Sequence, residues 1–254
     1  MEPVAGHWSH LSGYRPGKLV EADTYNLHEA MGVIKVCWLH LEERGFILRG
    51  TIVEYTHGRE DAMIDTQAIP PTLLTQIEEA TCATDFTMQS GTLTGALLRM
   101  LAASKPEGNF LELGTGTGMG TAWLLDGMDT ASRLVTVDKN ERYNAIARRF
   151  LSRDARVTFH TGDGEAFIRT QQAGTFDLIF ADMPPGKFQL LDETLALLRP
   201  GGLYIIDDLS PLESWEPAHA PRVTALIATL EQRSDLRICK LNWSTGLLIA
   251  TRIA

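Results

Sequence analysis

The sequence predicts an α/β fold: a mostly parallel sheet of seven strands with helices on both faces, preceded by an N-terminal extension. From about residue 70 onward, short apolar runs alternate with helix-like segments, which is the pattern of a parallel sheet with helical crossovers. A glycine-rich segment directly follows the first apolar run. The last two runs are separated only by residues 242–245, which is too short for a helical crossover. We therefore expect them to pair as an antiparallel hairpin.

The individual elements follow from hydrophobic periodicity and from turn residues. Two amphipathic helices come first, at 71–86 and 92–104, and the second repeats apolar side chains at helical spacing. Further helices are expected at 121–128, 141–152, 165–170, 187–198 and 221–232. Strands are expected at 109–113, 133–138, 157–161, 176–182, 203–207, 236–241 and 246–251.

Residues 1–66 are expected to form a separate extension, and residues 67–254 the main domain. Within the extension, one helical face is predicted to carry Leu27, Met31, Ile34, Trp38 and Leu41. Gly45 is a candidate C-cap for that helix, and a strand is predicted at 46–55. The extension has no assigned function; a dimerisation element, a lid and a packed extension are all open. A homodimer is the expected assembly.

Composition limits the kinds of binding partner and the cellular compartment that we expect for this protein. The chain has 254 residues and a net charge of −9 without a lysine or arginine block, so nucleic acid is a disfavoured substrate. The chain start has no basic segment leading into an apolar one, and no apolar run approaches membrane-spanning length, so no membrane association is expected. Cys37, Cys82 and Cys239 lie far apart and are expected to be buried thiols in a reducing compartment, which predicts a cytoplasmic protein.

The glycine-rich segment is the most informative motif. After Glu112, glycines stand at Gly114, Gly116 and Gly118, whereas a dinucleotide fingerprint would need a third glycine at Met119. The spacing resembles motif I of the class I S-adenosylmethionine-dependent methyltransferases. The resemblance implies that Glu112, Gly114, Thr115, Gly116 and Gly118 bind S-adenosyl-L-methionine. The alternative is a tight turn with no ligand.

Acidic residues fall at the carboxyl ends of the predicted strands, where ligands bind in open α/β sheets. Asp138 is a candidate to accept hydrogen bonds from both ribose hydroxyls, and its alternative is a helix N-cap. Asp163 resembles the residue that meets the adenine amino group, with ordinary turn chemistry as its alternative. Segment 88–95 resembles the segment that folds over the methionine moiety. Ser90 and Thr94 are candidates there, or plain helix caps.

Three longer motifs, at 111–118, 176–182 and 198–208, resemble the catechol and caffeoyl-CoA type of O-methyltransferase. The resemblance implies a Rossmann-like methyltransferase fold over about residues 70–254. It also implies that a divalent cation such as Mg²⁺ is held by Asp182, Asp207 and Asp208.

Two departures from that family pattern concern the same site. Asp208 stands where the family usually has asparagine, which gives three carboxylates. Two carboxylates about 4 Å apart repel by about 4 kcal/mol at an effective dielectric constant of about 20. Either a hard cation lies among them, or one carboxylate points away or is protonated. Asp207 and Asp208 are adjacent in a strand, so they converge only if the chain turns there.

The second departure is the position of a lysine. The family typically has it three residues after the aspartate, whereas here Lys187 follows Asp182 after a Met-Pro-Pro-Gly segment. Lys187 is a candidate general base, and its alternative is a solvated residue at a helix start.

These observations predict O-methylation of a small hydroxylated molecule, of phenol or catechol type, with Asp182 central as a catalytic and a donor-binding residue. The sequence Asp182-Met-Pro184-Pro185 distantly resembles the signature of amino-group methyltransferases, which is a second hypothesis. A third is a non-catalytic S-adenosylmethionine-binding partner protein. Trp215 and His219 are candidates to line the acceptor pocket, and a loop packed on the core is the alternative.

Overall fold

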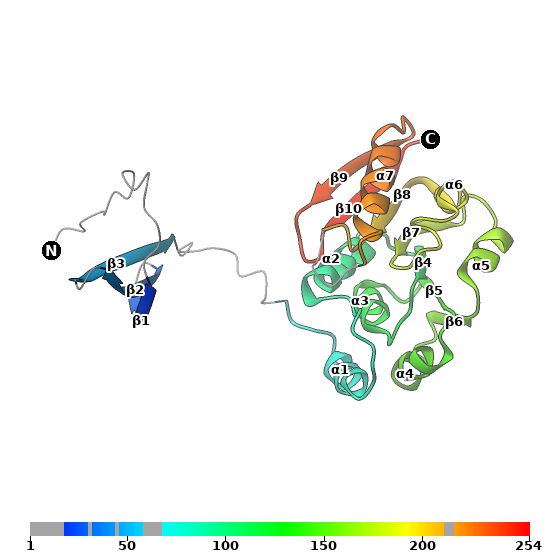
Figure 1. Ribbon diagram of the computed structural model, residues 1–254. Helices are drawn as coiled ribbons and strands as arrows, with labels where there is room; N and C mark the ends of the chain where they lie inside the picture. Colours follow the sequence, from blue (N-terminus) through cyan, green and yellow to red (C-terminus); the bar gives the residue numbers. More distant parts are fainter. Residues whose placement is uncertain (1–17, 30–31, 44–45, 58–67, 211–215) are drawn as a thin grey trace. The chain divides into compact units, whose positions relative to one another are not determined.

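A computed structural model describes residues 18–29, 32–43, 46–57, 68–210 and 216–254 (Figure 1). The chain divides into two units, Met1–Ile64 and Asp65–Ala254. The boundary expected between residues 66 and 67 lies outside the described residues.

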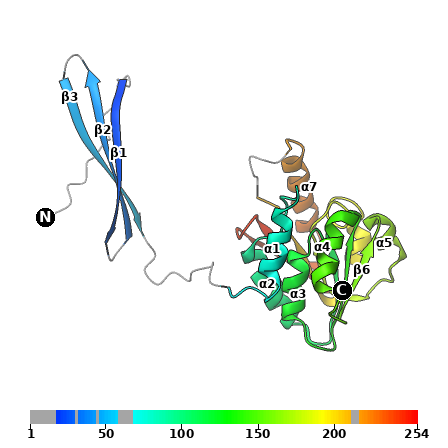
Figure 2. The same cartoon turned by 90° about the horizontal axis from the view of Figure 1, so that it is seen from below.

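The first unit contains a three-stranded antiparallel sheet in the order β1-β2-β3 (Figure 2). Its strands are Lys18–Glu29, Gly32–Glu43 and Phe46–His57. The helix predicted from Leu27 to Leu41 is therefore wrong, whereas the strand predicted at 46–55 is confirmed by β3. The segment 33–36 is rich in β-branched residues, which favour extended backbone, and every residue of β2 pairs with one of β3 in a single continuous register.

The second unit is built on a seven-stranded sheet in the order β6-β5-β4-β7-β8-β10-β9. Its strands are β4 Asn109–Leu113, β5 Arg133–Asp138, β6 Val157–Thr161, β7 Phe176–Ala181, β8 Leu198–Ile206, β9 Leu236–Leu241 and β10 Leu247–Arg252. Strands β4 to β8 pair in parallel, and β10 is antiparallel to both β8 and β9. The predicted seven-stranded sheet with a C-terminal antiparallel hairpin is confirmed.

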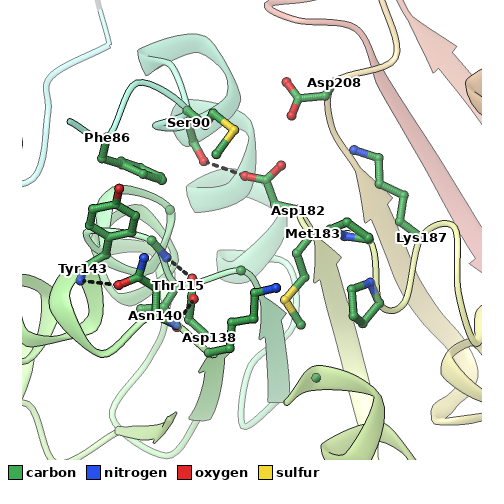
Figure 3. Close-up of a pocket in the computed structure, with 18 of the residues that line it drawn as sticks. Phe86, Ser90, Thr115, Asp138, Asn140, Tyr143, Asp182, Met183, Lys187 and Asp208 are labelled. Atoms are coloured by element: carbon green, nitrogen blue, oxygen red, sulfur yellow. Dashed lines mark hydrogen bonds between the residues drawn. The ribbon is translucent and has the colours of Figure 1, made fainter. Parts of the chain in front are cut away.

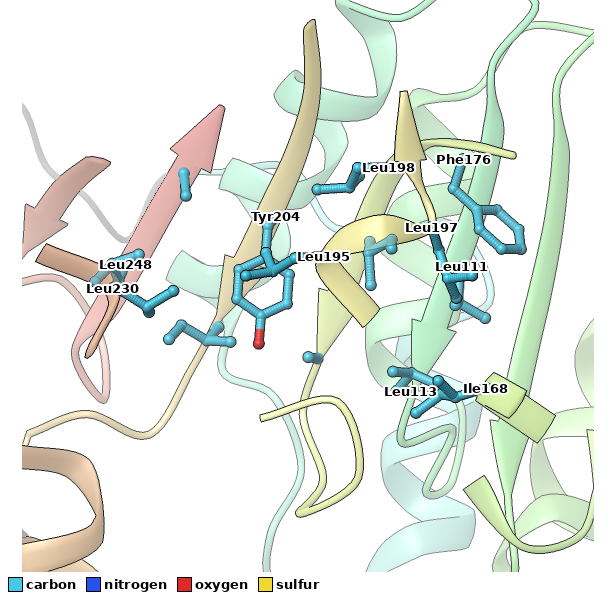
Figure 4. Packing of buried hydrophobic residues seen from close by; sticks show 14 of the residues in the cluster. Leu111, Leu113, Ile168, Phe176, Leu195, Leu197, Leu198, Tyr204, Leu230 and Leu248 are labelled. Atoms are coloured by element: carbon cyan, nitrogen blue, oxygen red, sulfur yellow. The ribbon is translucent and has the colours of Figure 1, made fainter. Parts of the chain in front are cut away.

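Helices cover both faces of this sheet (Figure 1). They are α1 Leu74–Cys82, α2 Thr92–Ala103, α3 Met119–Gly127, α4 Glu141–Leu151, α5 Gly164–Thr170, α6 Leu191–Ala196 and α7 His219–Glu231. Neighbouring strand residues point to opposite faces, so Phe110 and Leu111 enter two different core clusters. The Leu111 cluster packs under α5, α6 and α7 (Figure 4), and the Phe110 cluster under α1 to α4.

Three expectations differ in detail. The helix expected at 71–86 ends at Cys82, because the Thr84 hydroxyl donates to the Thr81 carbonyl and accepts the Phe86 N–H, which forms a turn. The helix expected at 187–198 is only α6, preceded by a loop. Cys82 and Cys239 are exposed, so the prediction of buried thiols is wrong for both.

Within the described part of the chain, no helix combines the length and the apolar character needed to cross a membrane.

Candidate functional site

A cavity of about 610 Å³ opens where the parallel strands end (Figure 3). Its wall is formed by the segments that follow β4, β5, β6, β7 and β8, together with the segment before α2 and the start of α7. The carboxyl ends of parallel strands are the expected place for a ligand in such a sheet. The structure brings these predicted residues to the cavity: Ser90, Gly114, Thr115, Gly116, Asp138, Asp163, Asp182, Lys187, Asp208 and His219.

The glycine loop between β4 and α3 is left-handed at three positions. The φ angles of Gly114, Gly116 and Gly118 are 114°, 49° and 97°. A Cβ atom on Gly114 would lie 2.9 Å from the Asp182 carbonyl oxygen, and one on Gly116 would lie 2.8 Å from the Phe86 ring. The glycines therefore let the loop pass close to two neighbouring segments that also form the cavity. Gly118 does not line the cavity; it is the residue before α3.

Glu112 lies behind the loop and does not line the cavity. It is fully buried, and its Oε2 accepts hydrogen bonds from the Thr121 hydroxyl at 2.5 Å and the Thr136 hydroxyl at 2.6 Å. Its Oε1 has no hydrogen-bond partner among the described residues. Burial raises the pKa of Glu112 to about 7. In this structure Glu112 ties β4 to β5 and α3.

Asp138 braces the glycine loop from the end of β5. Its Oδ2 accepts the Gly116 N–H and its Oδ1 accepts the Asn140 N–H, both at 2.8 Å. A carboxylate has about four acceptor positions, so Asp138 keeps capacity for further donors in the cavity. The N-cap of α4 is Asn140, whose Oδ1 accepts from Arg142 and Tyr143, so the alternative of Asp138 as that cap is wrong.

Asp163 lies at the start of α5, and its expected contact with an adenine amino group stays a prediction. It lines the cavity, and its Oδ1 accepts the Ala166 N–H at 2.8 Å, which makes it the N-cap of α5.

An aromatic pair covers this end of the cavity and was missed by the sequence analysis. The rings of Phe86 and Tyr143 lie 4.7 Å apart between centroids, with their planes at 50°. Phe86 carries no sequence signal for this position. Tyr143 lies in the first turn of α4, whose N-cap Asn140 accepts the Tyr143 N–H. Asparagine is a common N-cap residue, so the start of this helix is visible in the sequence.

Asp182, Lys187 and Asp208 line the cavity on the side away from Asp138, and their side chains are directed toward the same space (Figure 3). The Ser90 hydroxyl donates to Asp182 Oδ2 at 3.3 Å. Burial raises the pKa of Asp182 well above its usual value. The Asp208 charge raises it further, and the positive charge of Lys187 opposes the shift. Asp208 itself has a φ of 60°, a left-handed backbone that aspartate tolerates better than most residues.

Asp207 does not join this group. It is 2% exposed and absent from the cavity wall; its Oδ2 accepts the Thr94 hydroxyl at 2.9 Å. Its Oδ1 accepts the Asp208 N–H at 2.7 Å and the Thr245 hydroxyl. Thr94 is thus a buried partner of Asp207 and does not line the cavity. Across residues 68–210 and 216–254, no three His, Cys, Asp or Glu side chains are placed to hold a metal ion, so the predicted three-carboxylate set does not converge.

The outer wall at this end combines an aromatic ring with basic groups. The Arg222 guanidinium carbon lies 4.2 Å from the centroid of Phe188. The His219 ring meets the same ring edge-on, and its Nε2 lies 3.0 Å from the Asp208 carbonyl oxygen. Of the two residues expected to line the acceptor pocket, His219 lines the cavity. Trp215 lies outside the described residues.

The similarity to a known protein family lies within the second unit of the chain. Residues 111–209 match the family profile described as a methyltransferase domain. The second unit has the methyltransferase fold. The expected resemblance to O-methyltransferases, the catechol type included, is confirmed.

One curated protein to which this chain is similar is a catechol O-methyltransferase of Niastella koreensis. It is 32% identical over 123 residues, which are 45% of this chain and 55% of that protein. The chain spans about half the length of the curated relatives it matches.

Two solved structures share the fold. The O-methyltransferase from Bacillus cereus in complex with SAH has a TM-score of 0.64 and 20% identity, covering 74% of this chain and 94% of that one. The O-methyltransferase TomG from Streptomyces achromogenes in complex with SAM has a TM-score of 0.65 and 22% identity, covering 74% and 93%.

Proposed function

We propose that this protein transfers a methyl group from S-adenosyl-L-methionine to a hydroxyl of a small phenol-like or catechol-like acceptor. The observation that supports this proposal is a single cavity whose two ends differ. One end carries Asp138 and the aromatic pair, the other carries Lys187 and Asp208, and Asp182 lies between them beside Gly114 of the glycine loop (Figure 3).

The first end fits a nucleoside with an amino-acid tail. The cavity volume of about 610 Å³ falls in the range of about 300–1,000 Å³ that is usual for small-ligand sites. Asp138 has acceptor capacity for ribose hydroxyls, and the Phe86 and Tyr143 rings offer flat apolar surface for a base. We assign donor binding to Gly114, Thr115, Gly116, Asp138, Asp163 and Ser90, with Glu112 and Gly118 supporting the loop.

The second end fits a hydroxyl acceptor. When bound, S-adenosylmethionine supplies an activated methyl: the O–CH₃ bond forms as the S–CH₃ bond breaks, and the hydroxyl proton must leave. Asp182 and Lys187 are ionisable groups on the cavity wall; Asp182 is half-buried and Lys187 almost fully buried. We therefore assign removal of the hydroxyl proton to this pair. The chain's main contribution is to hold the acceptor oxygen in line and to exclude water.

The experiment is mass-detected methyl transfer from S-adenosylmethionine across a panel of hydroxyaromatic compounds and matched amines. Asp182→Asn is expected to lower turnover at least about 100-fold, because general acid–base groups contribute roughly 10²- to 10⁴-fold. Calorimetry should show that its Kd for S-adenosylhomocysteine stays within about threefold of wild type.

The matched control is Asp192→Asn, which alters an exposed carboxylate on α6 away from the cavity and should leave turnover unchanged. Methylation of amines alone would instead favour the amino-group hypothesis. Donor binding without turnover on any acceptor would favour the non-catalytic binding protein.

A further inference from the structure

The acceptor end of the cavity contains its own cation. Lys187 comes from the loop after β7, and its side chain extends toward the space beside Asp182 and Asp208 (Figure 3). Only 3% of Lys187 is exposed although it lines the cavity, so a charged side chain is held inside the protein at this point. This inference rests on the function proposed above.

The loop around Lys187 is rigidly built. The Pro184 carbonyl accepts the N–H groups of Lys187, Phe188 and Gln189 at 3.2, 2.8 and 3.1 Å. The Gly186 N–H donates to the Gln189 carbonyl at 2.7 Å, and the buried Tyr204 hydroxyl donates to the Gly186 carbonyl. Lys187 is therefore positioned by the fold and does not depend on solvent contacts.

The three carboxylates of the expected divalent-cation site do not converge on one point. The resemblance implies that three carboxylates hold the cation. In the structure, however, both oxygens of Asp207 accept hydrogen bonds, from the Thr94 and Thr245 hydroxyls and the Asp208 N–H. Turning Asp207 into the cavity would break these hydrogen bonds and leave the buried Thr94 hydroxyl and the half-buried Thr245 hydroxyl without their acceptor. What remains is a pair of carboxylates, Asp182 and Asp208, beside one lysine.

An ammonium group suits this pair. Two neighbouring carboxylates repel, and a positive charge beside them offsets the repulsion. Among the described residues, no ion pair within 4.0 Å joins Lys187 to either carboxylate, so its N–H donors are available to acceptor oxygens that enter between them.

We propose that the Lys187 ammonium performs at the acceptor end the role that the family resemblance gives to a divalent cation, so that methyl transfer in this protein needs no metal. The ammonium donates to the acceptor oxygens and stabilises the oxyanion that forms. Lys187 keeps its proton throughout, and the hydroxyl proton passes to Asp182. The sequence-based prediction that Lys187 is the general base is the competing role.

Two substitutions separate the competing roles. Lys187→Arg keeps a permanent positive charge but cannot accept a proton, and Lys187→Met removes the charge at similar length. Lys187→Arg is expected to keep more than a tenth of the wild-type kcat, and Lys187→Met to lose at least 100-fold. Loss of activity in Lys187→Arg as complete as in Lys187→Met would overturn the proposal. Both variants should bind S-adenosylhomocysteine within about threefold of wild type, which verifies that they are folded. Lys105→Met is the matched control, because Lys105 is a half-buried lysine away from the cavity whose Nζ donates to the Gly201 carbonyl.

The second readout is metal binding itself. Electron paramagnetic resonance of Mn²⁺ titrated into wild-type protein with S-adenosylhomocysteine should show no site that Asp182→Asn removes. A Mn²⁺ site that disappears in Asp182→Asn would overturn the proposal, as would a tenfold gain in turnover when Mg²⁺ is restored after EDTA. If wild type shows no turnover on any acceptor, the proposed function fails, whereas the Mn²⁺ titration still decides whether the acidic pair takes a metal.

Discussion

Glu112 shows how a single carboxyl group can support the donor end from behind. Its two hydroxyl partners hold it between β4, β5 and α3, while complete burial favours its neutral form. The space is tight: a Cβ atom on Gly120 would lie 2.5 Å from Glu112 Oε1. The residue therefore fixes the start of α3 and so the course of the glycine loop.

The raised pKa of Glu112 predicts a pH-dependent stability. Its pKa is about 7 in the fold and 4.5 in the unfolded chain. Stability from burying the neutral acid is thus complete below pH 4.5 and is lost as the pH rises through 7, by about 3 kcal/mol in all. Urea unfolding at pH 5 and pH 8 should show about 2.5 kcal/mol of this loss in wild type, because pH 5 is already above 4.5, and Glu112→Gln should lose about 2.5 kcal/mol less.

The control for that comparison is Glu193→Gln, a surface glutamate on α6, which should follow wild type at both pH values. Equal pH dependence in wild type and Glu112→Gln would show that Glu112 is not held in its neutral form by the fold.

At the same scale, the sequence indicates some site residues and conceals others. Asp138 and Asp182 end parallel strands, and that position alone brings them to the cavity. Asp207 and Asp208 diverge, as strand alternation favours. The hydroxyls that hold Asp207 come from Thr94 and Thr245, which are 113 and 38 residues away, so no local pattern reveals them.

Among the elements, α3 depends on a glycine where it begins. A Cβ atom on Gly118 would lie 2.8 Å from the Ala147 Cβ of α4, and its φ of 97° disfavours any side chain. Gly118 therefore allows α3 and α4 to lie close together on one face of the sheet.

Gly118→Ala is predicted to destabilise the fold by about 2–4 kcal/mol, combining backbone strain with overpacking. Gly174→Ala is the matched control, because Gly174 also has a positive φ, 67°, but a Cβ atom there would have no neighbouring atom within 4 Å. It should cost only the strain, about 1–2 kcal/mol. Denaturant unfolding measures both, and equal losses would show that the contact with Ala147 contributes nothing.

The elements of residues 70–254 could be predicted because strand length, turn residues and helical spacing agree there. The segment 27–41 misled the prediction because its apolar residues recur at helical spacing, whereas the strand β2 is formed by pairing with both β1 and β3. The loop after β7 was also missed, since Pro184 satisfies the N–H groups of Lys187 to Gln189 that a helix would use.

Considered as a whole molecule, the protein places all residues of the cavity in its second unit. Every lining residue falls between Phe86 and Arg222, and two core clusters pack the sheet from its two faces. The methyltransferase fold thus has its own core and its own site. The homodimer and the cytoplasmic location stay predictions.

A chain of residues 65–254 alone is therefore expected to bind S-adenosylhomocysteine with a Kd within about threefold of the full protein, as measured by calorimetry. It should also unfold in one cooperative transition. Binding that disappears with residues 1–64, although the shorter chain is folded, would show that the first unit completes the site.

The hydrogen bond from the Tyr204 hydroxyl to the Gly186 carbonyl links β8 to the loop that carries Lys187; Figure 4 shows Tyr204 among its apolar neighbours. Tyr204 is fully buried among the Leu111 cluster and touches no solvent. Directed evolution of acceptor preference would therefore gain from libraries that reach into this apolar layer, because a changed side chain there can tilt the lysine without altering any residue that a substrate meets.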